Sequence, residues 1–184
     1  TNAYSNTSTA FFMAKFMKTI EEMLVSPTPN WVIVGGYVTA GIVRGFVVGA
    51  LVLLTSLFFT HLVIYNIAVV LLAFILICIL FSLAGLLNAL FADSFDSIAI
   101  VPTFVLTPLT YLGGVFYSID RLPAFWQTVS YANPILYMVN AFRYGFLGIS
   151  DVNIFFSFGI LISLTVVFLT LILWLFKRGA GLKQ

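Results

Sequence analysis

The sequence predicts an all-α membrane protein, a polytopic bundle of helices that crosses the bilayer several times. Hydrophobic residues form 62% of the 184-residue chain, charged residues form 8%, and the mean hydropathy is +1.15. The 8 basic and 6 acidic residues cannot supply the polar surface of a soluble domain of this length. Residues 45–92 carry no formal charge. As one helix they would be about 72 Å long, against a hydrocarbon core of about 30 Å, so the chain has to cross more than once.

Four apolar segments are long enough to span the bilayer, and short polar stretches separate them. Residues 61–66 divide the first two, because they combine a histidine, an asparagine and an interfacial tyrosine. A turn at 93–96 precedes the third segment, and Lys177 and Arg178 end the fourth. We expect the full spans at about residues 37–60, 67–91, 97–117 and 152–176.

The first residues predict the end of a further membrane helix. Residues 1–9 are polar and uncharged, without the basic region and apolar core of a signal peptide. Residues 10–14 are interpreted as the tail of an earlier helix, in a longer protein whose first part is missing.

The third span contains two prolines, Pro102 and Pro108, and Gly113 with Gly114 marks its end. Each proline lacks an N–H and frees a carbonyl, so we expect a kinked helix whose free backbone groups are shielded by protein. Polar residues on this span are a candidate translocation path: Thr103, Thr107, Thr110 and the neighbouring Tyr111. The alternative is that the threonine hydroxyls bond to backbone freed by the prolines.

The bias of lysine and arginine towards the cytoplasm predicts the orientation. Basic residues gather before the first full span and after the last, at Lys15, Lys18, Arg44, Lys177, Arg178 and Lys183. Four spans place these two ends on one side, so we expect both, including the C-terminus, in the cytoplasm. Arg44 is expected to be a cytoplasmic anchor whose side chain extends towards the lipid head groups.

A cytoplasmic amphipathic helix is expected at residues 16–26, before the stop formed by Ser26 to Pro29. Apolar residues recur at helical spacing, and two acids lie early in the segment. The helix either rests on the lipid surface or docks into a protein partner. Two acids facing an anionic leaflet favour the partner. The candidate docking residues are Glu21, Glu22, Met23 and Leu24.

The external segment 118–150 is too long for a turn and too apolar for a solvated loop. Asn133 and Pro134 are a helix-start signal, and the apolar helix predicted at 135–146 is too short to span a bilayer. A re-entrant hairpin fits this pattern. Arg143 lies in this helix and needs a partner, for which Asp120, Asp151 or a helix C-terminus is expected.

The third span and the external segment together resemble the signature of the ABC-2 type transporter permease family. The residues at the matching spacings are Leu106, Leu109, Leu112, Gly113, Val115, Leu122, Pro123, Pro134, Ile135, Tyr137 and Arg143. Residues 19–27 are similar to the coupling-helix segment of the same family. The sequence as a whole most resembles bacterial inner-membrane permeases.

The resemblance implies a six-helix permease of the type V exporter kind, a homodimer that sits on two ATPase subunits. This chain matches the end of the second helix and the four that follow. ATP and Mg would be bound by the partner ATPase, and no cofactor by this chain. The family does not specify the cargo. The aromatic residues expected at the outer face form either an interfacial belt or the exit for an amphipathic or lipid-linked substrate.

Several other classes are disfavoured by the residues themselves. The sequence has no P-loop, and a single histidine, a single cysteine (Cys78) and scattered acids cannot assemble a catalytic triad or a metal site. A net charge of +2 without a basic run argues against nucleic acid. Two alternatives remain, an ion-coupled secondary transporter and a scaffold subunit. The first usually carries ionisable groups within its spans, and we expect none at the span centres.

Overall fold

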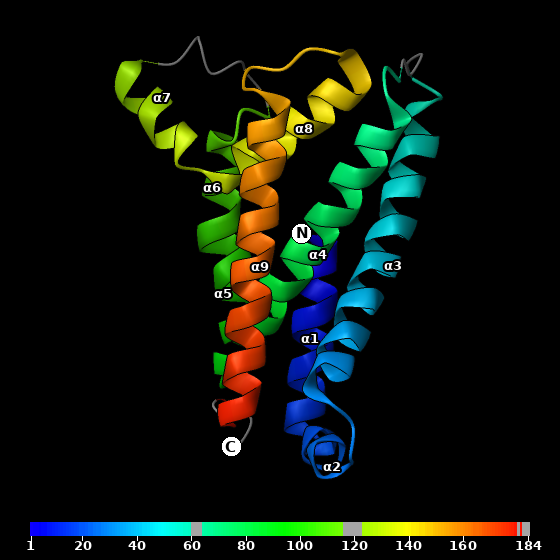
Figure 1. Ribbon diagram of the computed structural model, residues 1–184, viewed down its shortest axis with the longest axis vertical. Helices are drawn as coiled ribbons and strands as arrows, with labels where there is room; N and C mark the ends of the chain where they lie inside the picture. Colours follow the sequence, from blue (N-terminus) through cyan, green and yellow to red (C-terminus); the bar gives the residue numbers. More distant parts are fainter. Residues whose placement is uncertain (60–63, 116–122, 180, 182–184) are drawn as a thin grey trace.

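The computed structural model describes residues 1–59, 64–115, 123–179 and 181, and Figure 1 shows their arrangement. Expectations that concern His61, Asp120 or Leu122 lie outside the described residues. Within the described ranges the structure is helical and contains no strand, which confirms the all-α fold class. The elements are α1 (Asn2–Phe16), α2 (Thr19–Val25), α3 (Asn30–Ser56), α4 (Ile67–Phe91), α5 (Phe95–Ile100), the π-helix η1 (Val101–Leu106), α6 (Thr107–Leu112), α7 (Ala124–Tyr131), α8 (Pro134–Leu147) and α9 (Ile154–Arg178).

Four helical segments are long and apolar enough to cross a membrane: α3, α4, the α5–η1–α6 segment and α9. The limits of α4 agree with the prediction, since the Asn66 side chain caps its first turn by accepting from Ala68 N and Val69 N. The predicted start of the first span at residue 37 is wrong, because α3 already begins at Asn30, directly after Pro29. Two glycines in its second turn do not interrupt it.

Helix α1 is longer than the tail expected at residues 10–14. It includes the polar residues of the N-terminal segment, and Thr7 and Ser8 are fully buried. Burial of these hydroxyls is tolerated because each donates a hydrogen bond to a backbone carbonyl, Thr7 to Tyr37 O and Ser8 to Ser5 O. The apolar side of the same helix, with Phe11 and Phe12, fills the core between α3, α4 and α9.

Helices α3 and α4 approach closely along a stripe of glycines, a feature that the sequence reasoning missed. Gly41, Gly45 and Gly49 recur every four residues on α3. A Cβ atom at these positions would lie 2.1 Å from Ser82 Oγ, 2.7 Å from Cys78 Sγ and 2.9 Å from the Phe74 ring, which recur every four residues on α4. This is the small-residue packing by which membrane helices bring their backbones together.

The third span changes from α- to π-helix at Val101, directly before Pro102, and returns to α-helix at Thr107, directly before Pro108, which agrees with the expected break in regular hydrogen bonding. Pro102 cannot donate to the Ile98 carbonyl, and Asn88 Nδ2 of α4 donates to that oxygen instead, at 3.2 Å. Gly113 caps the segment and Gly114 follows with a φ of 74°. Protein thus shields the freed carbonyl, as the sequence predicted.

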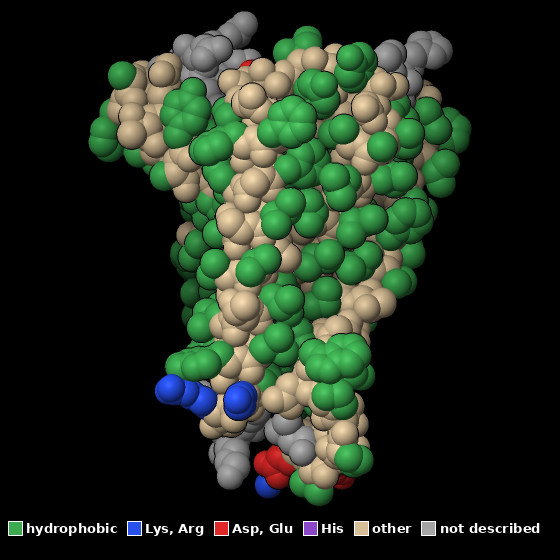
Figure 2. All heavy atoms as spheres, viewed as in Figure 1, with side chains coloured by type: hydrophobic (Ala, Val, Ile, Leu, Met, Phe, Trp, Pro, Cys, Tyr) green, Lys and Arg blue, Asp and Glu red, His purple; other side chains and the backbone are tan. Residues whose placement is uncertain are grey.

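The two ends of the bundle differ in content. Helix α2 and the C-terminal end of α9 lie at one end, and α7 and α8 lie at the other (Figure 1). On the face shown in Figure 2, lysine, arginine and acidic side chains gather at the α2 end, below a surface rich in apolar side chains. Arg178 stacks on the Trp174 ring there, 3.9 Å from its centroid. Among the described basic residues, Lys15 and Lys18 therefore lie at the same end of the bundle as Lys177 and Arg178, as an even number of spans requires.

Candidate functional site

Helix α2 is a short helix at the end of the bundle, and among its described side chains Ile20 anchors it to the core. Ile20 is fully buried in the core cluster that also contains Phe12 and Leu90. Lys18, with a φ of 60°, turns the chain between α1 and α2, and its carbonyl accepts from Glu21 N at 3.0 Å. The exposed side of α2 carries Glu21, Glu22, Met23 and Val25. It presents two acids beside apolar groups at the end of the molecule that faces away from α7 and α8.

The expected extent and face of this helix need correction. We predicted one helix over residues 16–26, but α1 continues to Phe16 and α2 has only seven residues, because Lys18 adopts a left-handed backbone conformation. Of the predicted apolar face, Ile20 is buried, whereas Met17 is 65% and Met23 is 39% exposed. The Leu24 side chain lies outside the described part of the structure.

Lys15 holds α1 and the adjoining turn against the end of α4 by two hydrogen bonds. Its side chain is 6% exposed, and its Nζ donates to Leu90 O at 3.1 Å and Ala92 O at 3.3 Å. These carbonyls end α4, where a helix has unsatisfied acceptors and a partial negative charge. The sequence reasoning used Lys15 only for orientation. Its position one residue before the end of α1 was the available signal for a helix-end contact.

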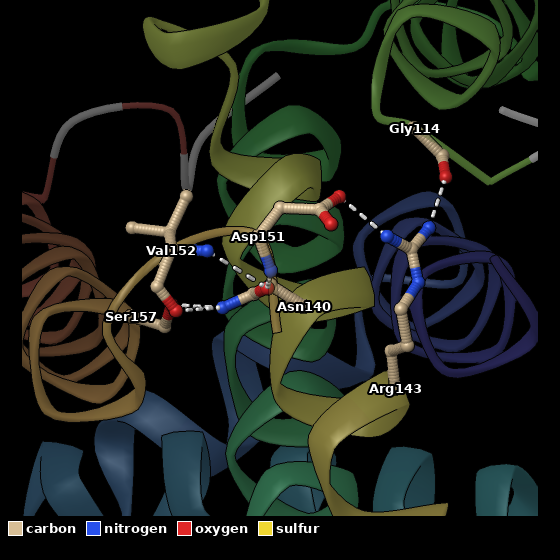
Figure 3. Close-up of polar contacts among 6 residues, drawn as sticks. All are labelled: Gly114, Asn140, Arg143, Asp151, Val152 and Ser157. Carbon is tan, nitrogen blue, oxygen red and sulfur yellow. Dashed lines mark hydrogen bonds and ion pairs between the residues drawn. The ribbon is translucent and has the colours of Figure 1, made fainter. Parts of the chain in front are cut away.

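At the opposite end, Arg143 has the partner that the sequence predicted among its candidates. Its Nη1 forms an ion pair with Asp151, and its Nη2 donates to Gly114 O at 2.7 Å. Figure 3 shows the guanidinium between these two groups. The side chains of Arg143 and Asp151 are 20% and 16% exposed. One arginine therefore joins α8, the segment before α9 and the end of the third span.

Asn140 completes this polar junction between α8 and α9. Its Oδ1 accepts from Asp151 N at 2.8 Å and from Val152 N at 3.3 Å, and its Nδ2 donates to Val152 O and to Ser157 Oγ (Figure 3). The side chain is 2% exposed, and its amide satisfies backbone groups that no helix pairs. Neither the sequence spacing nor the family signature pointed to this residue.

Several of the described residues of the family signature pack where α6, α7 and α8 meet. Asn133 caps α8 and donates to Leu109 O at 2.6 Å, and Gly113 allows close approach of Ile135, whose Cγ2 would be 2.8 Å from a Cβ there. Tyr137 Oη donates to Tyr131 O at 2.6 Å. Pro123 and Pro134 begin α7 and α8. Leu106 and Leu112 are partly buried on the third span.

The candidate path residues on the third span divide into two groups. Thr107 Oγ1 donates to Pro102 O at 3.0 Å and Thr110 Oγ1 to Leu106 O at 2.7 Å, which favours the backbone-bonding alternative for both. Thr103 instead lines a cleft of about 240 Å³ between α1 and the third span, together with Ser5, Ser8, Thr9, Phe95, Ile98, Ala99 and Pro102. Tyr111 is 59% exposed near the end of α6.

Arg44 lies at a different depth from the one expected. Arg44 lies in the middle part of α3, fourteen residues after Asn30 and twelve before Ser56, and therefore not near an end of the helix. Its side chain is exposed and its Nη1 donates to Asn6 Oδ1 of α1 at 3.0 Å. The expectation that no span centre carries an ionisable group is therefore wrong for α3. The error follows from the misplaced start of this span.

Comparison with known proteins identifies the family. The model of the ABC-2 type transporter family matches residues 1–147. The inner membrane transport permease YadH of Escherichia coli strain K12 is 54% identical over 184 residues, which are all of this chain and 72% of that protein. YadH of Shigella flexneri gives the same values. Nodulation protein J of Rhizobium leguminosarum bv. viciae is 28% identical over 87 residues, 47% of this chain and 34% of that protein.

No solved structure matches. The family match covers most of the chain, and the match to YadH extends along all of it, so the resemblance seen in the signature residues is confirmed. The four apolar helices and the identity to an inner-membrane permease agree on the location. The chain therefore belongs to the ABC-2 type transporter family, as a multi-pass permease of the inner membrane.

Proposed function

We propose that this chain is the membrane subunit of an ATP-driven exporter, and that a separate ATPase drives it through α2. An ATPase partner follows from the family, whose members are permease subunits of ABC transporters. In the proposed complex two copies of the chain meet two ATPase subunits, which bind ATP and Mg. The cargo is an amphipathic or lipid-linked compound that moves outward.

The observation that carries the proposal is the construction of α2. Its buried Ile20 fixes it to the core, Lys15 fixes the preceding turn to α4, and the acids and Met23 remain exposed. A helix that rested on lipid would turn its apolar side to the membrane and its charges away from an anionic surface. Here the anchored side is turned to protein, and the exposed side is both acidic and apolar. A displacement of α2 by the ATPase would move α1, α3 and α4 with it as rigid bodies.

The cleft between α1 and the third span supports a path for an amphipathic cargo. Its lining combines hydroxyls, those of Ser5, Thr9 and Thr103 among them, with apolar groups. The third span also borders a larger groove of about 530 Å³, formed with α4, α8 and α9 and lined mainly by apolar side chains. A cleft with hydroxyl groups in its lining and a larger apolar groove, both bordered by the third span, suit a molecule with a head group and a tail.

One observation favours the alternative function, an ion-coupled secondary transporter: Arg44 is an ionisable residue in the middle of α3. Proton coupling needs a group that loses and regains its proton, and an arginine side chain stays protonated in proteins. Among the described residues, no acid lies in the middle of an apolar span: Glu21 and Glu22 are in α2, Asp96 is in the first turn of the third span, and Asp93 and Asp151 lie between helices. The ATP-driven reading is therefore preferred.

The proposal is tested by copurification of the full permease with an ABC ATPase from the same organism. We expect the two proteins to form a complex, and the double substitution Glu21→Lys and Glu22→Lys to disrupt it. Asp93→Lys is the matched control, because Asp93 is an exposed acid at the same end of the bundle, after α4. A complex that survives the double substitution, or is lost equally in the control, would contradict docking on α2. Transport under an ion gradient without any ATPase would favour the rival.

A further inference from the structure

Arg44 lies deep in the membrane-spanning part and is open on one side. At about 1.5 Å per residue, it is about 21 Å from the start of α3 at Asn30 and about 18 Å from its end at Ser56. Trp31, 66% exposed in the first turn, is the type of residue that lies at the interface. Both distances exceed the reach of an arginine side chain. Arg44 therefore cannot place its charge among the head groups.

The surroundings of Arg44 are polar and lack an acid. Its guanidinium has five N–H donors, and the hydrogen bond that the structure gives it goes to the neutral Asn6. No carboxylate of the described residues forms an ion pair with it. The ion pair that the structure shows among these residues is Arg143 with Asp151. Within the described part of the chain, the other donors and the positive charge of Arg44 have no partner that the structure shows, and these are the groups that would bind a ligand.

The exposed side of α1 continues this polar surface towards the third span. The residues Asn2, Ser5, Asn6 and Thr9 follow the spacing of one helix face and are exposed or partly exposed. Arg44 of α3 contacts this face at Asn6, and Thr103 borders the cleft that contains Ser5 and Thr9. A polar strip thus leads from Arg44 across α1 to the proposed path.

Contact of this polar strip with lipid tails is energetically unfavourable. A charged side chain at the centre of a span is strongly disfavoured in hydrocarbon, and intramembrane arginines face polar cavities or partners. An anion fits better, because a guanidinium and amide and hydroxyl donors are the groups that bind phosphate and carboxylate oxygens.

We propose that Arg44, positioned by Asn6, binds the anionic head group of the transported amphiphile, a phosphate or a carboxylate, midway through the membrane. This inference rests on the proposed function and adds the charge of the cargo to it. Arg44 holds the head group while the tail stays in apolar surroundings. Asn6 is a positioning residue, since its carbonyl oxygen fixes the guanidinium and leaves the other donors free.

The test measures binding of two fluorescent probes to the full permease with its ATPase in phosphatidylcholine nanodiscs. One probe is a long-chain alkyl phosphate and the other is the matching alcohol. We expect the wild type to prefer the phosphate by roughly tenfold, as for a charge-assisted pair. Arg44→Gln should remove the preference, and Arg44→Lys should keep part of it. Arg178→Gln, a basic residue at the end of α9, is the control and should leave it unchanged. An unchanged preference in Arg44→Gln would overturn the inference.

Two further readouts separate the possible occupants of the strip. Cysteines placed at Asn6 or Arg44, with Cys78→Ser as background, should react with a membrane-impermeant maleimide, whereas Phe46→Cys on another side of α3 should not. Failure to react would mean that lipid, another segment or a second copy covers the strip, and would refute the inference. Trapping the ATPase with a non-hydrolysable ATP analogue should lower phosphate-probe affinity, and a static lipid site would not respond. If the complex forms and hydrolyses ATP but Arg44→Gln binds like wild type, only the anion inference fails. If no ATPase associates, the proposed function fails.

Discussion

The ion pair at the α8–α9 junction gives a prediction whose size follows from its environment. Asp151→Asn removes the carboxylate and leaves the Arg143 guanidinium with the Gly114 carbonyl as the remaining acceptor that the structure shows. Exposed pairs contribute about 0–1 kcal/mol, and loss of one partner of a buried pair costs about 3–5 kcal/mol. With side chains 20% and 16% exposed, this pair lies between the two limits. We expect a loss of about 2 kcal/mol.

A double-mutant cycle in detergent micelles measures this energy. Asp151→Asn, Arg143→Gln and the double variant are compared by thermal unfolding of the purified permease. For a chain of this length, about 2 kcal/mol corresponds to a decrease in Tm of roughly 4–8 °C. The double variant should lose less than the sum of the two single losses, because each removes the same interaction.

The charge-reversed pair, Arg143→Asp with Asp151→Arg, distinguishes an isolated ion pair from a junction. It restores opposite charges, but an aspartate at position 143 would face the Gly114 carbonyl without a proton to donate. We therefore expect it to remain less stable than the wild type. A change of less than about 0.5 kcal/mol in Asp151→Asn, typical of a surface position, would refute the reasoning.

Three further substitutions test the packing and the path. Gly41→Val should destabilise the protein by about 1–3 kcal/mol because its side chain has no room against α4 and α1, whereas Gly35→Ala, with nothing within 4 Å, should be tolerated; unfolding midpoints compare the two. Lys15→Met should destabilise the α1–α4 contact by about 1–3 kcal/mol by leaving two buried carbonyls unpaired, and unchanged hydrogen exchange at the end of α4 would argue against this. Thr107→Val should leave ATP-driven transport intact, whereas Thr103→Val should lower it; equal effects on flux in proteoliposomes would contradict the division between them.

The sequence predicted best those elements whose ends carry a local signal. Helix α4 lies between the Asn66 cap and a polar turn, so apolar length and capping were enough to place it. The pairing of Arg143 with Asp151 was among three stated candidates, because a charge in an apolar helix requires a partner. The proline pair in the third span predicted interrupted hydrogen bonding, although the π-helical register of Val101–Leu106 was not predicted.

Other features depend on residues distant in the chain. The left-handed conformation of Lys18 shortened α2, and no glycine marked the turn. The role of Lys15 requires the end of α4 to lie beside α1, which composition does not specify. The glycine stripe of α3 was readable as small-residue packing, but its partner positions on α4 came from the structure alone. Arg44 was misplaced because the start of α3 after Pro29 has no strong helix-start signal, and the error moved a central charge to a helix end.

The measurement that tests the central claim most directly is a site-specific crosslink from α2 to the partner ATPase. Met23→Cys, in a Cys78→Ser background, places the single thiol on the exposed side of α2 in the assembled transporter. We expect crosslinks to the ATPase whose yield changes when ATP binds, and none from Phe46→Cys within the membrane. Crosslinks from Met23 that reach only lipid head groups, with or without ATP, would contradict it.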